Sequence, residues 1–290
     1  MKERVKELVT AFSSRFIVVK PSTIEGAGEG VFLRGTSVPV KAPLSPYPGV
    51  VMTQTQLMET AKSWKRQVES GLITQDEFEE RMAYTVAITD DTVLVGSSKV
   101  RDPKRGVAHL ANDAMRCGLK DLEVGLSSLA LYKDETDQVK SLQLKCEGYL
   151  TCLNWILQYY KDSMMYSNAA LVGVEGVQCV VSFSPIKAGE EILVSYGPSY
   201  WYTRTARRMG LTIDDDTERV LELMMAMVHV DGDIGGPMIG TEGSIGSRER
   251  VEAGKLISRR GEEMLGTIVF AQSKAMTEAA ESPSCSCSVV

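Results

Sequence analysis

The stretch VAHLANDAMR, residues Val107 to Arg116, brings one His, one Asn and one Asp together within five positions. Such a combination occurs in metal centres, in fragments of catalytic triads, and in backbone segments that hold a cofactor. A metal centre of this kind usually needs several such ligands, and the chain's second histidine, His229, lies far away in a Gly-rich region. We therefore expect no metal here and interpret His109 as structural. The flanking sequence has to distinguish the other two alternatives.

The composition is typical of a globular protein. Of the 290 residues, 43% are hydrophobic, which is enough for a sizeable core. The net charge of -6 argues against broad phosphate binding, so we expect no direct nucleic-acid binding. No run approaches the roughly 20 apolar residues that span a bilayer, and the start, MKERVKELVTAFSSRF, lacks the apolar centre of a signal peptide. These features predict a soluble nuclear or cytoplasmic protein without membrane contact.

The cysteines predict neither disulfides nor a zinc site. No CxxC pair or zinc-finger spacing occurs, so we expect reduced thiols. The terminal CSCSVV superficially resembles a prenylation box on Cys287. However, Ser stands at the first of the two positions that are usually aliphatic, and Val stands at the last position. The six cysteines are Cys117, Cys146, Cys152, Cys179, Cys285 and Cys287.

Short β-branched segments alternate with helical patterns along the chain. This alternation predicts a mostly β fold with helical insertions, of the α+β class. Within one insertion, Thr74 and Glu77 have the spacing of a capping box. The expected parts are an N-terminal helix over 1–15, a main domain over 16–203 with helical insertions at about 54–83 and 118–166, a flank over 204–227, and a Gly-rich tail over 228–290. We expect the tail to be poorly ordered because it holds few large apolar residues.

The sequence GAGEG, Gly26 to Gly30, forms a Gly-rich turn between two predicted strands. Such a loop holds phosphates when a helix follows it directly. Here the β-branched and aromatic VFLRG follows, so we expect no phosphate site. Two interpretations remain: a plain tight hairpin, or a turn whose glycines let another group approach the backbone closely.

A second motif, IKAGEEILVSYG, runs from Ile186 to Gly197. Its Lys-Ala-Gly-Glu portion is typical of a surface turn. The following residues alternate as in a strand that ends at Tyr196-Gly197. Alone, this motif indicates only a strand with a terminal aromatic residue.

In their order along the chain, these motifs resemble the SET-domain protein lysine methyltransferases. The resemblance covers roughly 16–201 and implies several short β-sheets around a threaded pseudoknot. In that pseudoknot the segment HLANDAM passes beneath the terminal Tyr-Gly strand. The motifs, in chain order, are Gly28-Glu29-Gly30, Tyr47-Pro48-Gly49, the strand at Tyr84, Asn112-Asp113, Asn168-Ala169, Ala188-Gly189-Glu190-Glu191 and Tyr196-Gly197.

The resemblance implies S-adenosylmethionine (SAM) as the cofactor. Asn112 matches the family's Asn, which holds the amino end of the methionine part of SAM, and Tyr84 resembles an aromatic residue that touches SAM. Asp113 stands where the family has His, and its backbone matches groups that pair with adenine. Such pairing survives this change because the peptide groups are the same. The loop that wraps SAM is matched by Ala27, Gly28, Glu29 and Gly30.

The resemblance also implies methyl transfer to a lysine that a protein or peptide presents, with histone tails as the family's common target. Tyr196 matches the catalytic tyrosine, which also borders the cofactor. Val194 stands where the family has Phe or Tyr controlling the number of methyl groups, and its small size leaves room for a methylated amine. The aromatic lining of the lysine channel is matched by Tyr47, Tyr200 and Trp201.

Departures from the family keep a second interpretation open. Ser195 replaces the usual Asp, the stretch 118–166 separates Asn112 from Asn168, and the family's Cys-rich zinc flank is missing. Asp113, Ser195 and the long insertions favour an inactive SET-like interaction module, whereas the Gly-x-Gly loop, Tyr47 and Tyr196 favour an enzyme. A third interpretation is an unrelated β-rich scaffold with chance matches. The sequence leaves the oligomeric state open.

Overall fold

The chain forms two compact units, each built from separate stretches of sequence. The computed structural model describes residues 2–89, 91–97, 99–132, 135–174, 176–212 and 214–228. The first unit holds the described residues of Met1–Ala114 and Ser167–Ser195, and the second those of Met115–Tyr166 and Tyr196–Met238. The poor order expected beyond Val228, and the cysteines at 285 and 287, lie outside the described residues.

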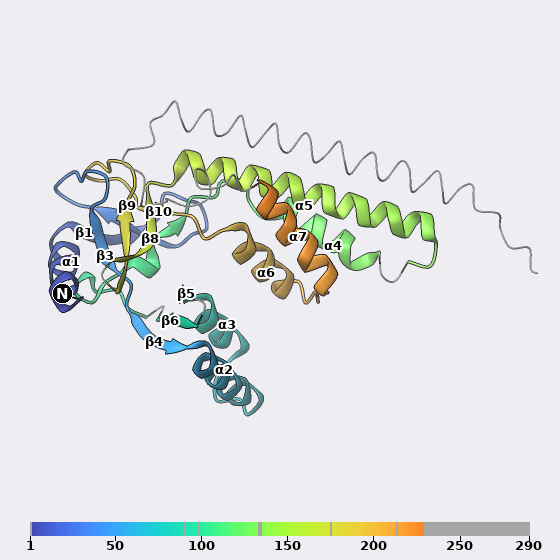
Figure 1. Cartoon of the computed structure of the whole chain (residues 1–290), viewed down its shortest axis with the longest axis horizontal. Coiled ribbons are helices and arrows are strands. Elements are labelled where there is room, and N and C mark those ends of the chain that lie inside the picture. The colour runs from blue at the N-terminus through green and yellow to red at the C-terminus, as the bar shows by residue number, and fades with distance from the viewer. Residues whose placement is uncertain are drawn as a thin grey trace, which may run out of the picture. The chain divides into compact units, whose positions relative to one another are not determined.

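The first unit contains a hairpin and a three-stranded sheet that surround one apolar core (Figure 1). The hairpin is antiparallel, and the sheet has the order β3-β9-β8 with antiparallel neighbours. The elements are α1 (Lys2–Phe16), β1 (Ile17–Pro21), β2 (Glu29–Leu33), β3 (Pro43–Pro46), β8 (Ala169–Val174) and β9 (Val177–Ser182). Their core includes Ile17, Leu33, Leu44, Val107, Ile186 and Ile192. Removal of such side chains from water is the main stabilising contribution to this unit.

A second three-stranded sheet of the first unit, with the order β4-β6-β5, carries two helices. Thr53 and Thr74 each cap a helix with a reciprocal capping box, so the prediction at Thr74 and Glu77 is confirmed. Leu57, Val93 and Val95 form the apolar contact between this sheet and its helices. The elements are β4 (Gly49–Thr53), α2 (Gln54–Glu69), α3 (Gln75–Ala83), β5 (Thr85–Thr89) and β6 (Thr92–Gly96).

A short parallel pair joins distant parts of the first unit. The strand β7 (Asn112–Asp113) follows two 3₁₀ turns, η1 (Pro103–Arg105) and η2 (Ala108–Leu110), and pairs with β10 (Leu193–Val194). Asn168 ties β10 to β8, since its side chain donates to the Glu191 carbonyl and accepts from the Leu193 amide, at 2.8 and 2.9 Å. The strand predicted to continue to Tyr196-Gly197 is only two residues long and ends at Val194.

The second unit is helical. The long helix α5 is packed against α4 and contacts α6 and α7 as well (Figure 1). The four helices are α4 (Lys120–Leu131), α5 (Gln138–Tyr166), α6 (Pro198–Arg208) and α7 (Asp215–Val228). Their shared core includes Leu122, Leu126, Leu153, Tyr159 and Leu221. The predicted insertion 118–166 and the predicted flank 204–227 thus contribute to one core.

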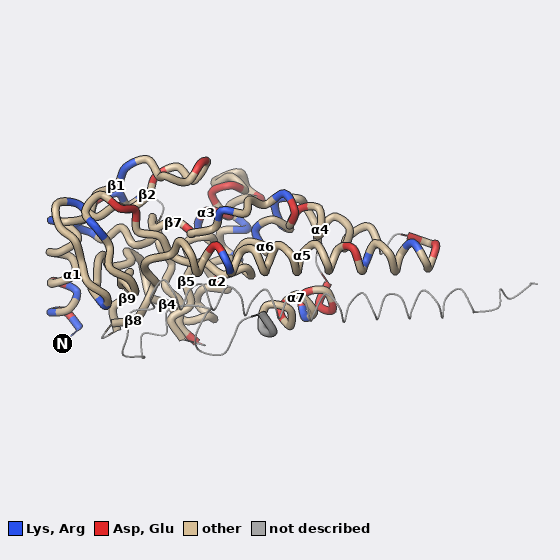
Figure 2. The backbone as a smooth tube through the Cα atoms, turned by 90° about the horizontal axis from the view of Figure 1, so that it is seen from above, with Lys and Arg blue, Asp and Glu red and all other residues tan. Residues whose placement is uncertain are grey.

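The structure confirms the α+β class with several small sheets and corrects the prediction that strands predominate. Among the described residues the α-helices contain more residues than the strands. Two of these helices, α6 and α7, lie within 198–228, where the sequence patterns predict no helix. Lys and Arg alternate with Asp and Glu along the chain, for example on α1 and α2 (Figure 2). None of the described helices is long and apolar enough to cross a bilayer.

Candidate functional site

The Gly-rich loop is held close to a buried glutamate. The loop connects β1 to β2, and the amide of Ser22 donates to the Gly28 carbonyl at 2.8 Å. Gly28 has a φ of 73°, which favours glycine. At Gly30 a Cβ atom would lie 2.1 Å from Oε1 of Glu191. Of the two interpretations of GAGEG, the structure therefore supports close approach at Gly30, and the approaching group is the Glu191 side chain.

Glu191 is the centre of a hydrogen-bond network that joins three segments of the first unit. Oε1 accepts from the Ser22 hydroxyl at 2.7 Å and from Nδ2 of Asn112 at 3.1 Å. Oε2 accepts from the amide and the hydroxyl of Thr23, at 2.8 and 2.5 Å. The residue is only 6% exposed. Burial acts to raise the pKa of Glu191, but hydrogen bonds from Thr23, Ser22 and Asn112 outweigh it, so this pKa lies below its ordinary value. The carboxylate is therefore ionised at neutral pH.

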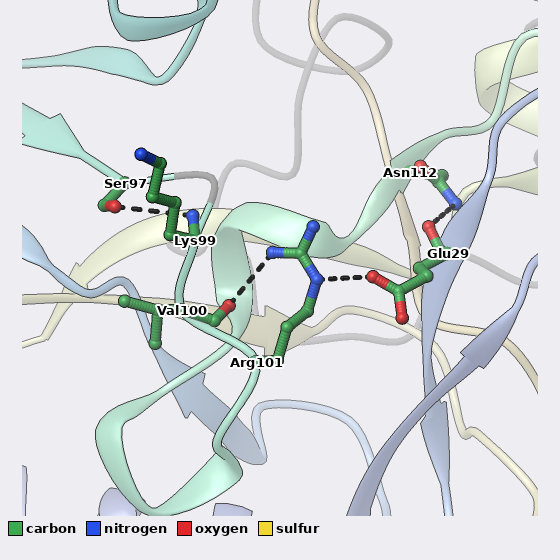
Figure 3. A network of polar contacts seen from close by, with 6 residues as sticks. All are labelled: Glu29, Ser97, Lys99, Val100, Arg101 and Asn112. Atoms are coloured by element: carbon green, nitrogen blue, oxygen red, sulfur yellow. Dashed lines mark hydrogen bonds and ion pairs between the residues drawn. The ribbon is translucent and has the colours of Figure 1, made fainter.

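The Asn112 side chain has a fixed orientation. Its Nδ2 atom donates to the Glu29 carbonyl at 2.9 Å (Figure 3). The same atom also donates to Oε1 of Glu191 at 3.1 Å. Both partners are acceptors, so the nitrogen rather than the oxygen must face them. The Oδ1 atom accepts no hydrogen bond from the residues that the structure describes. The site thus offers a hydrogen-bond acceptor, as a ligand that carries N–H groups requires.

The Glu29 side chain points the other way and forms an ion pair with Arg101 (Figure 3). Arg101 also donates to the Val100 carbonyl at 3.3 Å. Both partners of the ion pair are almost half exposed, at 49% for Glu29 and 45% for Arg101. Exposed pairs of this kind contribute little to stability, typically about 0–1 kcal/mol. The pair links the Gly-rich loop to the segment before η1.

Tyr47 and Tyr84 both lie against His109. Their ring centroids are 5.9 and 5.7 Å from that of His109, in edge-on arrangements. The Tyr47 hydroxyl donates to the Tyr84 carbonyl at 3.0 Å. Tyr47 and Tyr84, predicted to contact substrate and cofactor respectively, thus share one aromatic cluster.

His109 is buried, at 4% exposed, and neither ring nitrogen has a hydrogen-bond partner of good geometry among the described residues. Burial, reinforced by the positive charge of Arg101, lowers the pKa of His109 to about 4, while the Val100 carbonyl acts in the opposite direction. His109 is therefore neutral at pH 7. No group of three or more potential metal ligands occurs in the described ranges.

The remaining candidates of the first unit lie beside this network. Val194 is opposite Asp113 in the parallel pair, and both are buried. The amide of Ala114 donates to the Val194 carbonyl at 2.8 Å and extends the pairing. The amide of Ala27 donates to the Ile24 carbonyl at 3.2 Å, within the turn that precedes Gly28.

Three predicted aromatic residues cluster in the second unit. The Tyr196 ring lies 4.9 Å from that of Tyr200 and 6.1 Å from that of Trp201, measured between centroids. Tyr196 is 38% exposed. The amide of Gly197 donates to the Tyr159 hydroxyl at 2.8 Å, so the fully buried Tyr159 of α5 anchors the Tyr-Gly segment. The structure thus brings Tyr196, Tyr200 and Trp201 together.

Sequence reasoning missed four residues that support these clusters: Ser22, Thr23, Tyr159 and Glu191. Glu191 belongs to a motif, but the motif alone assigns it no role. No sequence signal distinguishes Glu191 from its charged and exposed neighbours Lys187 and Glu190. No sequence signal connects Tyr159 to Gly197, because that contact depends on the packing of α5.

A separate pocket of about 540 Å³ lies in the second unit, lined from α4, α5 and the segment before them. Its charged lining residues are two acids and two bases: Arg116, Asp121, Lys161 and Asp162. The predicted site residues do not line it. A lining of balanced charge indicates no particular ligand.

A scan of protein-family models gives no match to this chain. A search of the curated proteins gives no match either.

Proposed function

We propose that this chain is a SET-type methyltransferase that uses SAM to methylate a lysine side chain of a protein. The observation that carries the proposal is the position of Asn112. Its amide connects the Gly-rich loop at Glu29 to the segment that leads into β10 at Glu191. Three motifs that lie far apart in the sequence therefore meet at one side chain. Parallel pairing of β7 with β10 supports the threaded arrangement that the resemblance implies.

The residues present fit SAM. The amino group of SAM is a cationic donor, and Oδ1 of Asn112 is an acceptor without a partner in the described chain. The ionised Glu191 behind Asn112 adds negative charge. The glycines of the loop leave the backbone accessible to a ligand. We therefore assign cofactor binding to the loop 27–30, to Asn112 and Asp113, and to Tyr84.

Bound SAM supplies a methyl group activated by the sulfonium, and the chain has to supply orientation and a neutral lysine. Alignment of the amine with the methyl carbon converts binding energy into rate. Burial of the lysine among aromatic rings lowers its pKa and so favours the neutral amine. Aromatic faces also tolerate the cationic methylated product. The resemblance assigns the lysine-binding role to Tyr47 and Val194 in the first unit and to Tyr200 and Trp201 in the second.

We assign the catalytic role to Tyr196. Its hydroxyl orients the amine and stabilises the charge on the methyl group as the new C–N bond forms and the S–C bond breaks. The amine then loses its proton to solvent. Tyr159 supports this role from a distance by fixing the amide of Gly197.

A second candidate function is that of an inactive SET-like interaction module. The observation that favours it is Asp113, whose buried side chain stands in place of the family's His. An inactive module requires neither Tyr196 nor an open acceptor at Asn112.

Two measurements on the full chain test the proposal. Calorimetric titration with SAM is expected to show one site, and transfer of labelled methyl from SAM to proteins of a cell extract is expected to label specific proteins. SAM binding without labelling of any protein across broad substrate libraries favours the interaction module. The absence of SAM binding contradicts the methyltransferase proposal, because it removes the cofactor site.

A further inference from the structure

We propose that Glu191 gives this site its preference for a cationic ligand, by fixing the Asn112 amide so that its oxygen faces the ligand and by placing an uncompensated negative charge behind it. This inference rests on the proposed function, and it adds a positioning residue that acts through Asn112. Glu191 itself need not touch the ligand.

Asn112 cannot present its nitrogen to a ligand. A primary amide has two N–H groups, and both are used, by the Glu29 carbonyl at 2.9 Å and by Oε1 of Glu191 at 3.1 Å. Rotation of the amide by 180° would bring Oδ1 against two acceptors. The Glu29 carbonyl is fixed in β2, and Glu191 is therefore the partner whose chemistry can vary.

The Glu191 side chain is itself immobilised. Its two oxygens accept four hydrogen bonds, from Ser22, Asn112 and twice from Thr23. An ionised carboxylate has about four acceptor positions, so none is left for another donor. Gly30 packs so closely that even a methyl group there would overlap Oε1.

The buried Glu191 carboxylate carries a negative charge that no ion pair in the described ranges neutralises. Within the described ranges no Lys, Arg or His nitrogen forms a salt bridge with Glu191, although the residue is 6% exposed. The negative charge of Glu191 is therefore stabilised by hydrogen bonds, and no cation in the described part of the chain neutralises it. A buried charge of this kind favours an opposite charge nearby, and the amide of Asn112 transmits its polarisation to Oδ1. A ligand that bears an ammonium group fits this arrangement, and an anionic ligand does not.

The test is the Glu191→Gln variant. The Thr23 amide requires an acceptor, so the new NH₂ group takes the position of Oε1 and meets Nδ2 of Asn112, donor against donor. Either orientation of Asn112 then opposes like groups, and the oxygen is no longer fixed toward the ligand. The matched control is Glu190→Gln, which removes the same charge from an exposed neighbour whose carboxylate accepts from the Lys187 amide at 2.9 Å.

Three probes separate this role from general damage to the fold: SAM, S-adenosylhomocysteine, which keeps the ammonium and loses the sulfonium, and methylthioadenosine, which lacks both charges. Calorimetry is expected to show that Glu191→Gln weakens SAM and S-adenosylhomocysteine by about tenfold or more, and methylthioadenosine by less than about twofold. Glu190→Gln is expected to leave all three affinities unchanged.

Equal effects of Glu191→Gln on all three probes, whether none or a uniform loss, overturn the inference. If Glu191→Gln does not fold, Thr23→Ala provides a second test, because it removes a hydrogen bond that fixes the Glu191 carboxylate and leaves the assigned cofactor-binding residues unchanged. Failure of the parent protein to bind SAM overturns the proposed function, whereas SAM binding by the parent with equal effects on the probes overturns this inference alone.

Discussion

At Asn112, one side chain stabilises the fold and, under the proposed function, also holds the ligand. Its Nδ2 atom satisfies the Glu29 carbonyl and the buried Glu191 carboxylate, and its Oδ1 atom remains for a ligand. Asn112→Ala is therefore expected to lower SAM affinity about tenfold or more and to lower the free energy of unfolding by about 1–3 kcal/mol. Calorimetry and urea denaturation measure the two effects. Asn154→Ala, on an exposed position of α5, is the control and is expected to change neither. Unchanged SAM affinity in Asn112→Ala would remove this residue from the site.

His109 makes stability depend on pH. Its pKa is about 4 in the folded protein and has its ordinary value of 6.5 in the unfolded chain, so the unfolded chain binds more protons between these values. The stability that the neutral ring permits is fully present above pH 6.5 and is lost as the pH falls through this window toward 4. The full loss is on the order of 3 kcal/mol.

The comparison of the parent with His109→Phe isolates this effect, because the second histidine, His229, is present in both. Between pH 7.5 and 5.5 the parent is expected to lose about 1 kcal/mol more than the variant in chemical denaturation. Parallel stability curves for the two proteins would show that His109 does not titrate in this way.

The Tyr196 hydroxyl is the group on which the enzymatic proposal depends most. Tyr196→Phe keeps the ring contacts with Tyr200 and Trp201, so SAM affinity is expected to stay within a few-fold. Loss of a preorganised donor at the transition state typically slows a reaction by about 10²–10³. Single-turnover transfer of labelled methyl at saturating SAM measures this rate. A variant that reacts at the parental rate contradicts the assigned role.

Among the elements, α4 and α5 pack so closely at Gly125 that no side chain fits there. A Cβ at Gly125 would lie 2.7 Å from Sγ of Cys152. Gly125→Ala gains about 1 kcal/mol of helix propensity, but overpacking of such a contact costs about 1–3 kcal/mol. We expect a net loss of stability in urea denaturation. Val124→Ala, at a 51% exposed neighbour, is the control and is expected to change stability little. A stabilised Gly125→Ala would show that the helices separate without cost.

The sequence predicts best those elements whose signal is local. The capping box at Thr74 and Glu77 needs only four residues, and its helix forms as predicted. By contrast, α6 begins with PSYWYT, which is rich in aromatic and hydroxyl residues of weak helix propensity. It is helical because Tyr202 and Ala206 are buried against α5 and α7. Its buried residues, Pro198, Tyr202, Thr205 and Ala206, have helical spacing, but none is a large aliphatic residue, so the pattern does not stand out in the sequence.

The same distinction applies to the candidate site. The residues of the Gly-rich loop, Asn112 and Tyr196 could be named in advance because short motifs contain them. The donors Ser22 and Thr23 could not, because their partner Glu191 lies 169 and 168 residues further along the chain. The division of the chain into two units was also missed. It depends on 115–166 and 196–228 sharing a core, and the motifs carry no information on that.

For the whole molecule, the network at Glu191 has a consequence for the order of folding. Contacts between α4 and α5 join segments that are near neighbours in sequence. The Glu191 carboxylate, by contrast, binds Asn112 and Ser22, which lie 79 and 169 residues away in the sequence. Closing a long loop costs conformational entropy before the stabilising contact forms, and this cost slows folding. In refolding from urea, far-ultraviolet circular dichroism is therefore expected to recover before the capacity to bind SAM. Simultaneous recovery would contradict this order. A newly made chain would thus be rich in helix while still unable to bind SAM. The ability to bind SAM would report that segments far apart in the sequence have formed the network at Glu191.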